Sequence, residues 1–159
     1  MPSHPANGPT GPLAQVSLLD RLARALQPFA ASRSVRSIAL LGLCAAYIQG
    51  GLTKILNFSA AIAEVQSFGL PFAALTAGAT IVTELVGSAL ILTGMYRWLG
   101  ALWLAGFTLV ATFVANRFWE VLPPQRFMVE NSFFEHLGLV GGFLLVAWFD
   151  LRESHAASP

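Results

Sequence analysis

Four long apolar segments constrain the fold of this chain more than any other feature. A helix that crosses a bilayer needs about 20 predominantly apolar residues, and each segment meets that length within the usual tolerance. Only 11% of the 159 residues are charged, whereas a soluble domain carries about 25%, which argues against a large soluble helical core. We therefore expect an all-α, polytopic membrane protein that forms a bundle of four transmembrane helices. The predicted spans are Ser37–Leu56, Pro71–Met95, Trp98–Ala115 and Phe133–Phe149.

Basic residues predict the orientation of these spans. Cytoplasmic loops of membrane proteins carry an excess of Lys and Arg. Four arginines precede the first span, Arg97 lies between the second and third, and Arg152 follows the fourth, whereas Lys54, Arg117 and Arg126 lie on the opposite side. This distribution predicts that both the N and C termini are cytoplasmic, in agreement with an even number of spans.

The residues outside the spans divide into tails and short amphipathic helices. Residues 1–16 are rich in Pro and Gly, which predicts a disordered tail. In residues 17–31, leucines and Phe29 recur at helical spacing, with Arg21 and Arg24 on the other side. This pattern predicts a helix on the inner membrane surface, and a helix that binds a partner protein is the alternative. The complete division is a tail (1–16), an interfacial helix (17–31), a membrane domain (36–152) with a second short helix after its first span, and a C-terminal tail (153–159).

Glu84 is the most informative polar residue, because it lies about 13 residues, or about 20 Å, from the outer end of its span. An ionised side chain near the middle of a bilayer costs at least about 3 kcal/mol. We therefore expect Glu84 to face the bundle interior and to be either protonated or partnered. Gln49 is the nearest polar side chain in depth, and Lys54 is long enough to reach inward. A hydrogen bond that merely bridges two helices is the alternative interpretation.

A second polar cluster is predicted where the helix ends meet at the outer boundary. Its cations and anions balance, which favours mutual pairing. His136 lies about one turn inside this boundary, where it can exchange a proton with the outer aqueous phase or hydrogen-bond a quinone carbonyl. A boundary histidine bonded to its neighbours is the alternative. The cluster comprises Lys54, Asn116, Arg117, Glu120, Arg126, Glu130, Asn131, Glu135 and His136.

The sequence also restricts the cofactors of this chain. His136 is the only histidine within a span and Cys44 is the only cysteine, so we expect no bis-histidine haem and no iron–sulfur cluster. Nucleotide-binding glycine motifs and metal-ligand spacings are absent from the sequence, and we expect no nucleotide, metal or nucleic acid. A quinone needs only an apolar slot and proton-exchanging groups. The predicted catalytic residues are Glu84, Lys54 and His136, and the predicted binding residues are these three with Gln49, Asn116 and Glu135.

The membrane part carries an ordered set of motifs. GGLTK ends the first span, a G-L-P turn follows, the second span contains TELVGSALILTG before YR, and the last contains GGFLL before Asp150. This set resembles the DoxX family of small bacterial membrane proteins over about residues 36–152. The resemblance implies a four-helix bundle in the bacterial inner membrane. The matching positions are Gly51, Lys54, Gly69, Pro71, Glu84, Gly87, Gly94 and Arg97.

Some DoxX relatives are described as small subunits of quinone-linked oxidoreductases, including thiosulfate:quinone enzymes, and others as members of membrane complexes involved in redox stress. The resemblance therefore implies lipids and other redox-complex subunits as partners, and a quinone-binding role for Glu84 with a Lys54/His136 layer. The alternative is a non-catalytic anchor or assembly subunit. A carrier for protons or small solutes is a third hypothesis, against which the absence of an inverted repeat argues. A cavity beside Glu84 would favour the quinone-binding subunit, and a tightly packed interior would favour the anchor or assembly subunit.

Overall fold

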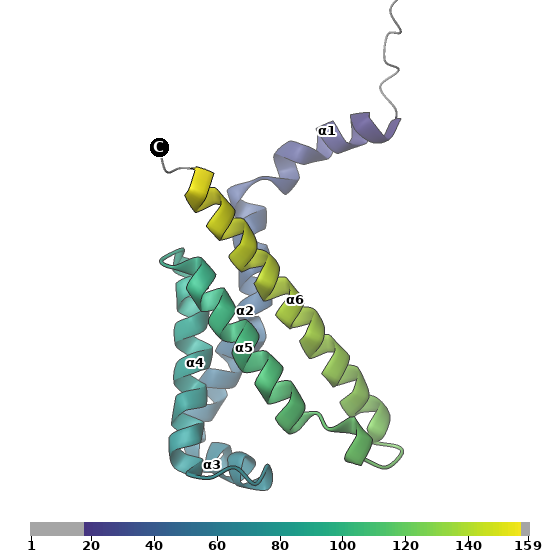
Figure 1. Cartoon of the computed structure of the whole chain (residues 1–159). Helices are drawn as coiled ribbons and strands as arrows, with labels where there is room; N and C mark the ends of the chain where they lie inside the picture. Colours follow the sequence, from purple (N-terminus) through teal and green to yellow (C-terminus); the bar gives the residue numbers. More distant parts are fainter. Residues whose placement is uncertain (1–17, 157–159) are drawn as a thin grey trace, which may run out of the picture. The chain divides into compact units, whose positions relative to one another are not determined.

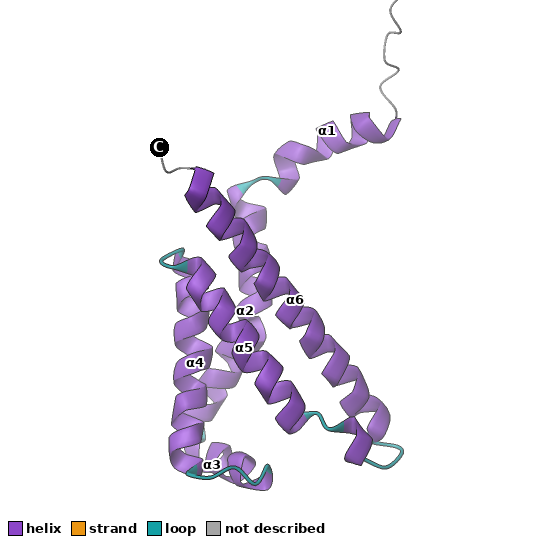
Figure 2. Cartoon of the chain, viewed as in Figure 1, coloured by secondary structure: helices purple, strands orange, loops and turns teal. Residues whose placement is uncertain are grey.

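The computed structural model describes residues 18–156. The predicted tail 1–16 and the last three residues of the predicted C-terminal tail lie outside this range. The described residues are helical, with no strand among them (Figures 1 and 2), which confirms the all-α prediction. The elements are α1 (Leu18–Ala30), α2 (Arg33–Leu56), α3 (Phe58–Ser67), α4 (Ala73–Thr93), α5 (Arg97–Ala115), the 3₁₀ helix η1 (Phe118–Glu120) and α6 (Arg126–Ala156).

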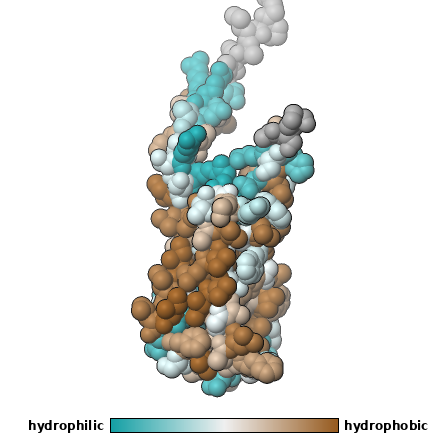
Figure 3. Space-filling view, turned by 90° about the vertical axis from the view of Figure 1, so that its left-hand side faces the viewer, coloured by the Kyte–Doolittle hydropathy of each residue, from teal (hydrophilic) through white to brown (hydrophobic). Residues whose placement is uncertain are grey.

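Four of these helices, α2, α4, α5 and α6, are long and apolar enough to cross a membrane. Each overlaps one of the four predicted spans, so the chain is a multi-pass membrane protein. Large apolar side chains on their outer surfaces, such as those of Leu41, Leu109 and Leu145, are 53%, 40% and 59% exposed. Figure 3 shows hydrophobic residues over much of one face of the helices, with hydrophilic residues toward the ends. This surface is in contact with lipid.

The chain divides into two compact units after Arg36. The N-terminal unit contains α1, the link to α2 and the first residues of α2 itself. The C-terminal unit contains the rest of α2 and all later helices.

The buried core of the C-terminal unit is formed where α2, α4, α5 and α6 meet. Tyr47 packs edge-on against Phe143, with ring centroids 5.3 Å apart, and Cys44 is fully buried among apolar side chains. The core residues are Leu40, Cys44, Tyr47, Ile91, Ala101, Leu104, Ala105, Phe143 and Ala147.

Small residues set the distance between these helices. A Cβ on Gly87 would lie 2.7 Å from the Leu104 side chain, and one on Gly100 would lie 2.8 Å from the Gly87 carbonyl oxygen. Glycine at these positions therefore allows α4 and α5 to approach closely, as small-residue spacing predicts for membrane helices. By contrast, nothing lies within 4 Å of a Cβ built on Gly138, so that glycine marks no close helix contact among the described residues.

Two glycines with positive φ mark turns between helices. Gly69 (φ 70°) follows α3 in the predicted Gly69–Pro71 turn, and Gly94 (φ 81°) ends α4. The left-handed region suits glycine because it has no Cβ. At the start of α3, the Asn57 side chain accepts a hydrogen bond from the Ala60 amide at 3.2 Å, as an N-cap residue does.

An ion pair joins the ends of three spans. Arg97 donates from Nε to the Ile91 carbonyl oxygen at 2.9 Å and from Nη1 to Asp150 Oδ1 at 3.3 Å. Asp150 Oδ2 also accepts a hydrogen bond from the Trp98 amide at 3.1 Å. Because these contacts connect the end of α4, the start of α5 and the last part of α6, they fix the helices at the end of the bundle opposite α3.

Helix α6 is longer than predicted at both ends. The sequence predicts a span over Phe133–Phe149, whereas the helix runs from Arg126 to Ala156, a total of 31 residues. At about 1.5 Å per residue its length is about 46 Å, which exceeds the roughly 30 Å hydrocarbon core of a bilayer. Residues 126–132 lie outside the predicted span but contain no proline or glycine, so the helix begins soon after Pro124. Residues 153–156, predicted as a tail, are helical as well.

Candidate functional site

A buried ion pair joins α2 and α4. Lys54 Nζ donates to Glu84 Oε1 at 3.0 Å and to Oε2 at 3.2 Å. Glu84 is only 7% exposed, so it faces the interior, as an acid in the middle of a span must. Its partner is Lys54 rather than Gln49, which is exposed and donates to Thr53 Oγ1 at 3.1 Å.

Two consecutive glycines on α2 make room for this pair. A Cβ on Gly51 would lie 2.8 Å from the Leu85 side chain, and one on Gly50 would lie 3.3 Å from Lys54 Nζ and 3.4 Å from Glu84 Oε2. Side chains on a helix lean toward its N-terminus, over the residue one turn earlier. The Lys54 side chain therefore extends over Gly50 to reach Glu84. The GGLTK motif is explained by this close approach of α2 to α4.

A cavity of about 380 Å³ opens beside the pair. This volume lies within the range of small-molecule binding sites, about 300–1,000 Å³. The cavity is bounded by residues of five helices, α2 to α6, and most of its surface is apolar. Its polar side chains are Tyr47, Lys54, Glu64, Thr76, Thr80, Glu84, Thr108 and His136.

A pair of hydroxyl groups forms part of the cavity wall. Tyr47 Oη lies 2.6 Å from Thr108 Oγ1, and Thr108 Oγ1 donates to the Leu104 carbonyl oxygen at 2.6 Å. Because the threonine hydroxyl has one proton, the tyrosine is the donor in their contact. The tyrosine oxygen can still accept a hydrogen bond from a bound molecule.

His136 reaches the same cavity from α6. Its Nδ1 lies 2.6 Å from the Ser132 carbonyl oxygen. Since a carbonyl oxygen can only accept, Nδ1 carries the proton in this contact. Nε2 then has no hydrogen-bond partner among residues 18–156 and, in the neutral ring, is an acceptor.

Three predicted site residues do not contribute to the cavity wall. Asn116 lies beside the histidine, with Nδ2 3.3 Å from His136 Nδ1. Glu135 is exposed and accepts a hydrogen bond from Asn131 Nδ2 at 3.2 Å. Gln49 is exposed on α2. The cavity thus brings together Lys54, Glu84 and His136, and leaves Gln49, Asn116 and Glu135 outside.

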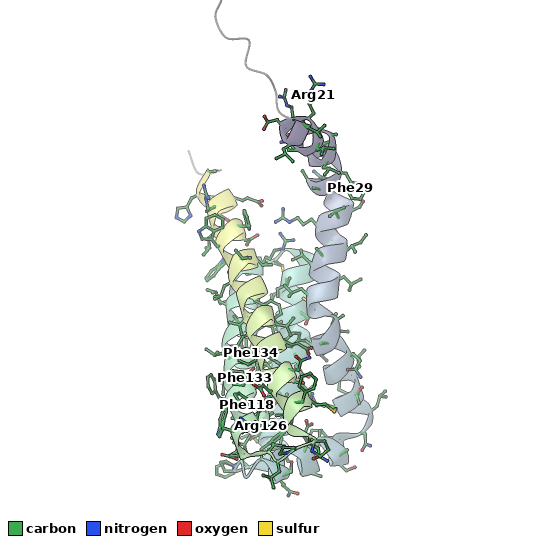
Figure 4. All side chains as sticks on the ribbon, turned by 90° about the vertical axis from the view of Figure 1, so that its right-hand side faces the viewer. Arg21, Phe29, Phe118, Arg126, Phe133 and Phe134 are labelled. Carbon is green, nitrogen blue, oxygen red and sulfur yellow. The ribbon has the colours of Figure 1, made fainter. Side chains whose placement is uncertain are left out.

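The predicted outer cluster separates into smaller contacts. Arg117 and Glu120 form an exposed ion pair at 3.1 Å. Arg126 lies over the Phe118 ring, 6.0 Å from its centroid, and Phe118 packs edge-on against Phe133. Figure 4 shows Phe118, Phe133, Phe134 and Arg126 gathered in one part of the molecule. This part of the cluster is an aromatic contact and does not extend the cavity.

The predicted site did not include five polar residues of the cavity wall: Tyr47, Glu64, Thr76, Thr80 and Thr108. Two of them carried a detectable signal. Tyr47 lies seven residues before Lys54, and Thr80 lies four residues before Glu84, so each shares a helix face with a predicted site residue. Glu64 and Thr108 belong to other helices, and their contribution depends on how those helices pack.

A comparison with protein families matches the DoxX family model to residues 37–117, which is half of the chain. The matched segment contains Tyr47, Lys54, Glu84 and Thr108 and ends before α6, which carries His136. No curated protein and no solved structure gives a significant match.

Proposed function

Because this multi-pass membrane protein belongs to the DoxX family, we propose that it is a small membrane subunit of a quinone-linked oxidoreductase complex. The observation that carries the proposal is the cavity of about 380 Å³ beside the Lys54–Glu84 pair. A tightly packed interior would have favoured a purely structural role. We further propose that the complex lies in the bacterial inner membrane, with both termini of this subunit in the cytoplasm.

The charges of the site favour an uncharged polar headgroup. Lys54 and Glu84 neutralise each other, so a phosphate group in the cavity would lack an unpaired cation. An ammonium group has three N–H donors, and two of those of Lys54 are directed to Glu84. The third is available to a quinone carbonyl oxygen. The apolar walls accommodate the ring, as in most small-molecule sites.

The proposed role in catalysis is proton exchange. Reduction of a quinone to a quinol requires two electrons and two protons. The electrons come from a partner subunit that carries a redox cofactor. At one side of the headgroup Lys54, held by Glu84, donates one proton to a quinone oxygen. At the other side His136 takes a proton from the outer aqueous phase at Nε2 and donates it to the second quinone oxygen, so that both protons are supplied. Such positioned acid–base groups typically accelerate a reaction by about 10²–10⁴-fold.

A non-catalytic anchor or assembly subunit is the second candidate. Both carboxylate oxygens of Glu84 are already satisfied by Lys54, and Arg97 and Asp150 join three helices in a similar way. Polar contacts of this kind can hold membrane helices together without any chemistry.

Quinone content separates the two candidates. The protein is purified with its native lipids, the lipids are extracted, and quinone per protein is measured by chromatography. We expect quinone in the native protein and its loss in Glu84→Gln, which removes the charge, and in Ala111→Phe, which fills the cavity and leaves the ion pair intact. Glu135→Gln and Leu109→Phe are the matched controls, because neither side chain lines the cavity. Equal quinone content in all variants, with loss of partner subunits, would favour the anchor.

A further inference from the structure

Helix α1 carries an apolar face that the other described residues of the N-terminal unit, 31–36, do not cover. No residue of α1 is buried. At 3.6 residues per turn, the large apolar side chains fall within an arc of about 100°. Their exposure in water would be unfavourable, so this face requires a partner. The residues and their exposed fractions are Leu18 (73%), Leu19 (75%), Leu22 (50%), Leu26 (61%) and Phe29 (70%).

The charge of the same unit is strongly basic. Arg21 and Arg24 lie on α1, Arg33 and Arg36 open α2, and Asp20 is the acidic residue of α1. Figure 4 shows Arg21 and Phe29 pointing in different directions from α1. An apolar stripe with arginines beside it is typical of helices that lie in the headgroup region of anionic bilayers.

The link to α2 keeps α1 close to the membrane. Only Ala31 and Ser32 separate α1 from α2, and two residues reach at most about 7 Å. The Ser32 hydroxyl accepts a hydrogen bond from the Val35 amide at 3.2 Å, so α2 begins directly after this link. Because α2 is a membrane span, a lipid surface is within reach of α1 at any angle between the two helices. A protein partner would have to compete with that surface.

We propose that α1 binds anionic lipid, with its apolar face among the acyl chains and its arginines near the lipid phosphates. The inference does not depend on quinone binding. Each arginine near an anionic surface strengthens such binding by about 1 kcal/mol, which is about fivefold.

The test uses the full-length chain with a fluorescent probe on α1. In a Cys44→Ala background, an environment-sensitive fluorophore is attached to Leu22→Cys on the apolar face or, as the matched control, to Gln27→Cys on the polar face. Each protein is reconstituted into nanodiscs of phosphatidylcholine alone or with phosphatidylglycerol. We expect a blue-shifted emission and quenching by spin-labelled lipid at position 22, only with phosphatidylglycerol, and little change at position 27.

The arginines provide the second measurement. Arg21→Gln combined with Arg24→Gln should weaken the burial of the probe at position 22 by about fivefold per arginine, and added salt should weaken it in the native sequence. The quinone content of this variant should remain unchanged. A probe that stays exposed in both lipids, or is buried equally in both, would overturn the proposal. Burial in native membranes alone would also overturn it and would identify a protein partner.

Discussion

Lys54 Nζ lies 3.0 Å from Glu84 Oε1, and the contact joins two spans whose residues are 30 positions apart in sequence. The two side chains are 21% and 9% exposed. Ionised groups within a membrane cost free energy unless they are paired. The contact therefore lowers the free-energy cost of burying both Lys54 and Glu84. The same pair lies at the wall of a cavity. It can therefore serve stability and ligand binding together, and these contributions are separable by mutation.

Removing one member of the pair should destabilise the bundle more than removing both. For Lys54→Met or Glu84→Met alone we expect a loss of about 3 kcal/mol, the low end of the range for breaking a buried pair, because Lys54 is partly exposed. The double variant should lose less than either single variant. Unfolding in mixed detergent micelles measures all three, and additive losses would contradict a direct interaction.

Alanine substitutions at two glycines of α5, Gly100 and Gly106, should have opposite effects on stability. In Gly100→Ala the new Cβ would lie 2.8 Å from the Gly87 carbonyl oxygen, whereas nothing lies within 4 Å of a Cβ at Gly106. Because a backbone atom cannot move aside easily, we expect Gly100→Ala to cost about 1–3 kcal/mol. Gly106→Ala should leave the unfolding free energy unchanged or raise it slightly, since alanine favours a helix. Equal stability of the two variants would exclude a close α4–α5 contact.

The Arg97–Asp150 ion pair should contribute more to the free energy of unfolding than the exposed Arg117–Glu120 pair near η1. Asp150→Ala removes the acceptor of both Arg97 and the Trp98 amide, and we expect a loss of about 1–3 kcal/mol. Glu120→Ala is the control, because Arg117 and Glu120 are 43% and 53% exposed and such surface pairs contribute about 0–1 kcal/mol. Thermal unfolding measures both variants. A larger loss of stability in Glu120→Ala than in Asp150→Ala would contradict the proposed importance of the Arg97–Asp150 ion pair.

Tyr47 and Tyr96 provide a comparison between the chain's two tyrosines. Tyr47→Phe removes a hydroxyl that lies 2.6 Å from Thr108 Oγ1 and keeps the ring that packs against Phe143. We expect a loss of about 1 kcal/mol in unfolding free energy. Tyr96 is 64% exposed, so Tyr96→Phe should change stability by less than about 0.5 kcal/mol. No difference between the variants would mean that the Tyr47–Thr108 bond does not stabilise the fold.

The distribution of basic residues predicts which chain segments face the cytoplasm. In a Cys44→Ala background, a membrane-impermeant maleimide applied to intact spheroplasts should label Gln125→Cys, before α6, and not Ala156→Cys, at its end. Both cysteines should react after the membrane is lysed, which controls for accessibility. The reverse labelling pattern would place the termini outside.

Much of the candidate site could be predicted from the sequence, because the free-energy cost of a charged side chain in hydrocarbon does not depend on how the helices pack. This cost alone required Glu84 to point inward, and the structure places it there. The partner could not be chosen in the same way, because Gln49 and Lys54 lie five residues apart on one helix. The rotation of α2 decides between them, and that rotation depends on Gly50 and Gly51 packing against α4.

The fourth span illustrates a different limit of sequence reasoning. Hydropathy located its apolar centre but not its ends, because polar residues at positions 126–132 continue the helix without a breaker. The helix consequently carries Arg126 and Glu130, which lie outside the predicted span Phe133–Phe149.

The sequence by itself determined that the chain crosses a membrane four times and that its buried acid faces the interior, since both follow from local hydrophobicity and the cost of an exposed charge. Only the tertiary structure decided that Lys54 is the partner of that acid and that a cavity reaches from it to Tyr47 and His136. These features depend on how side chains from five helices fill space together, and no single segment contains that information.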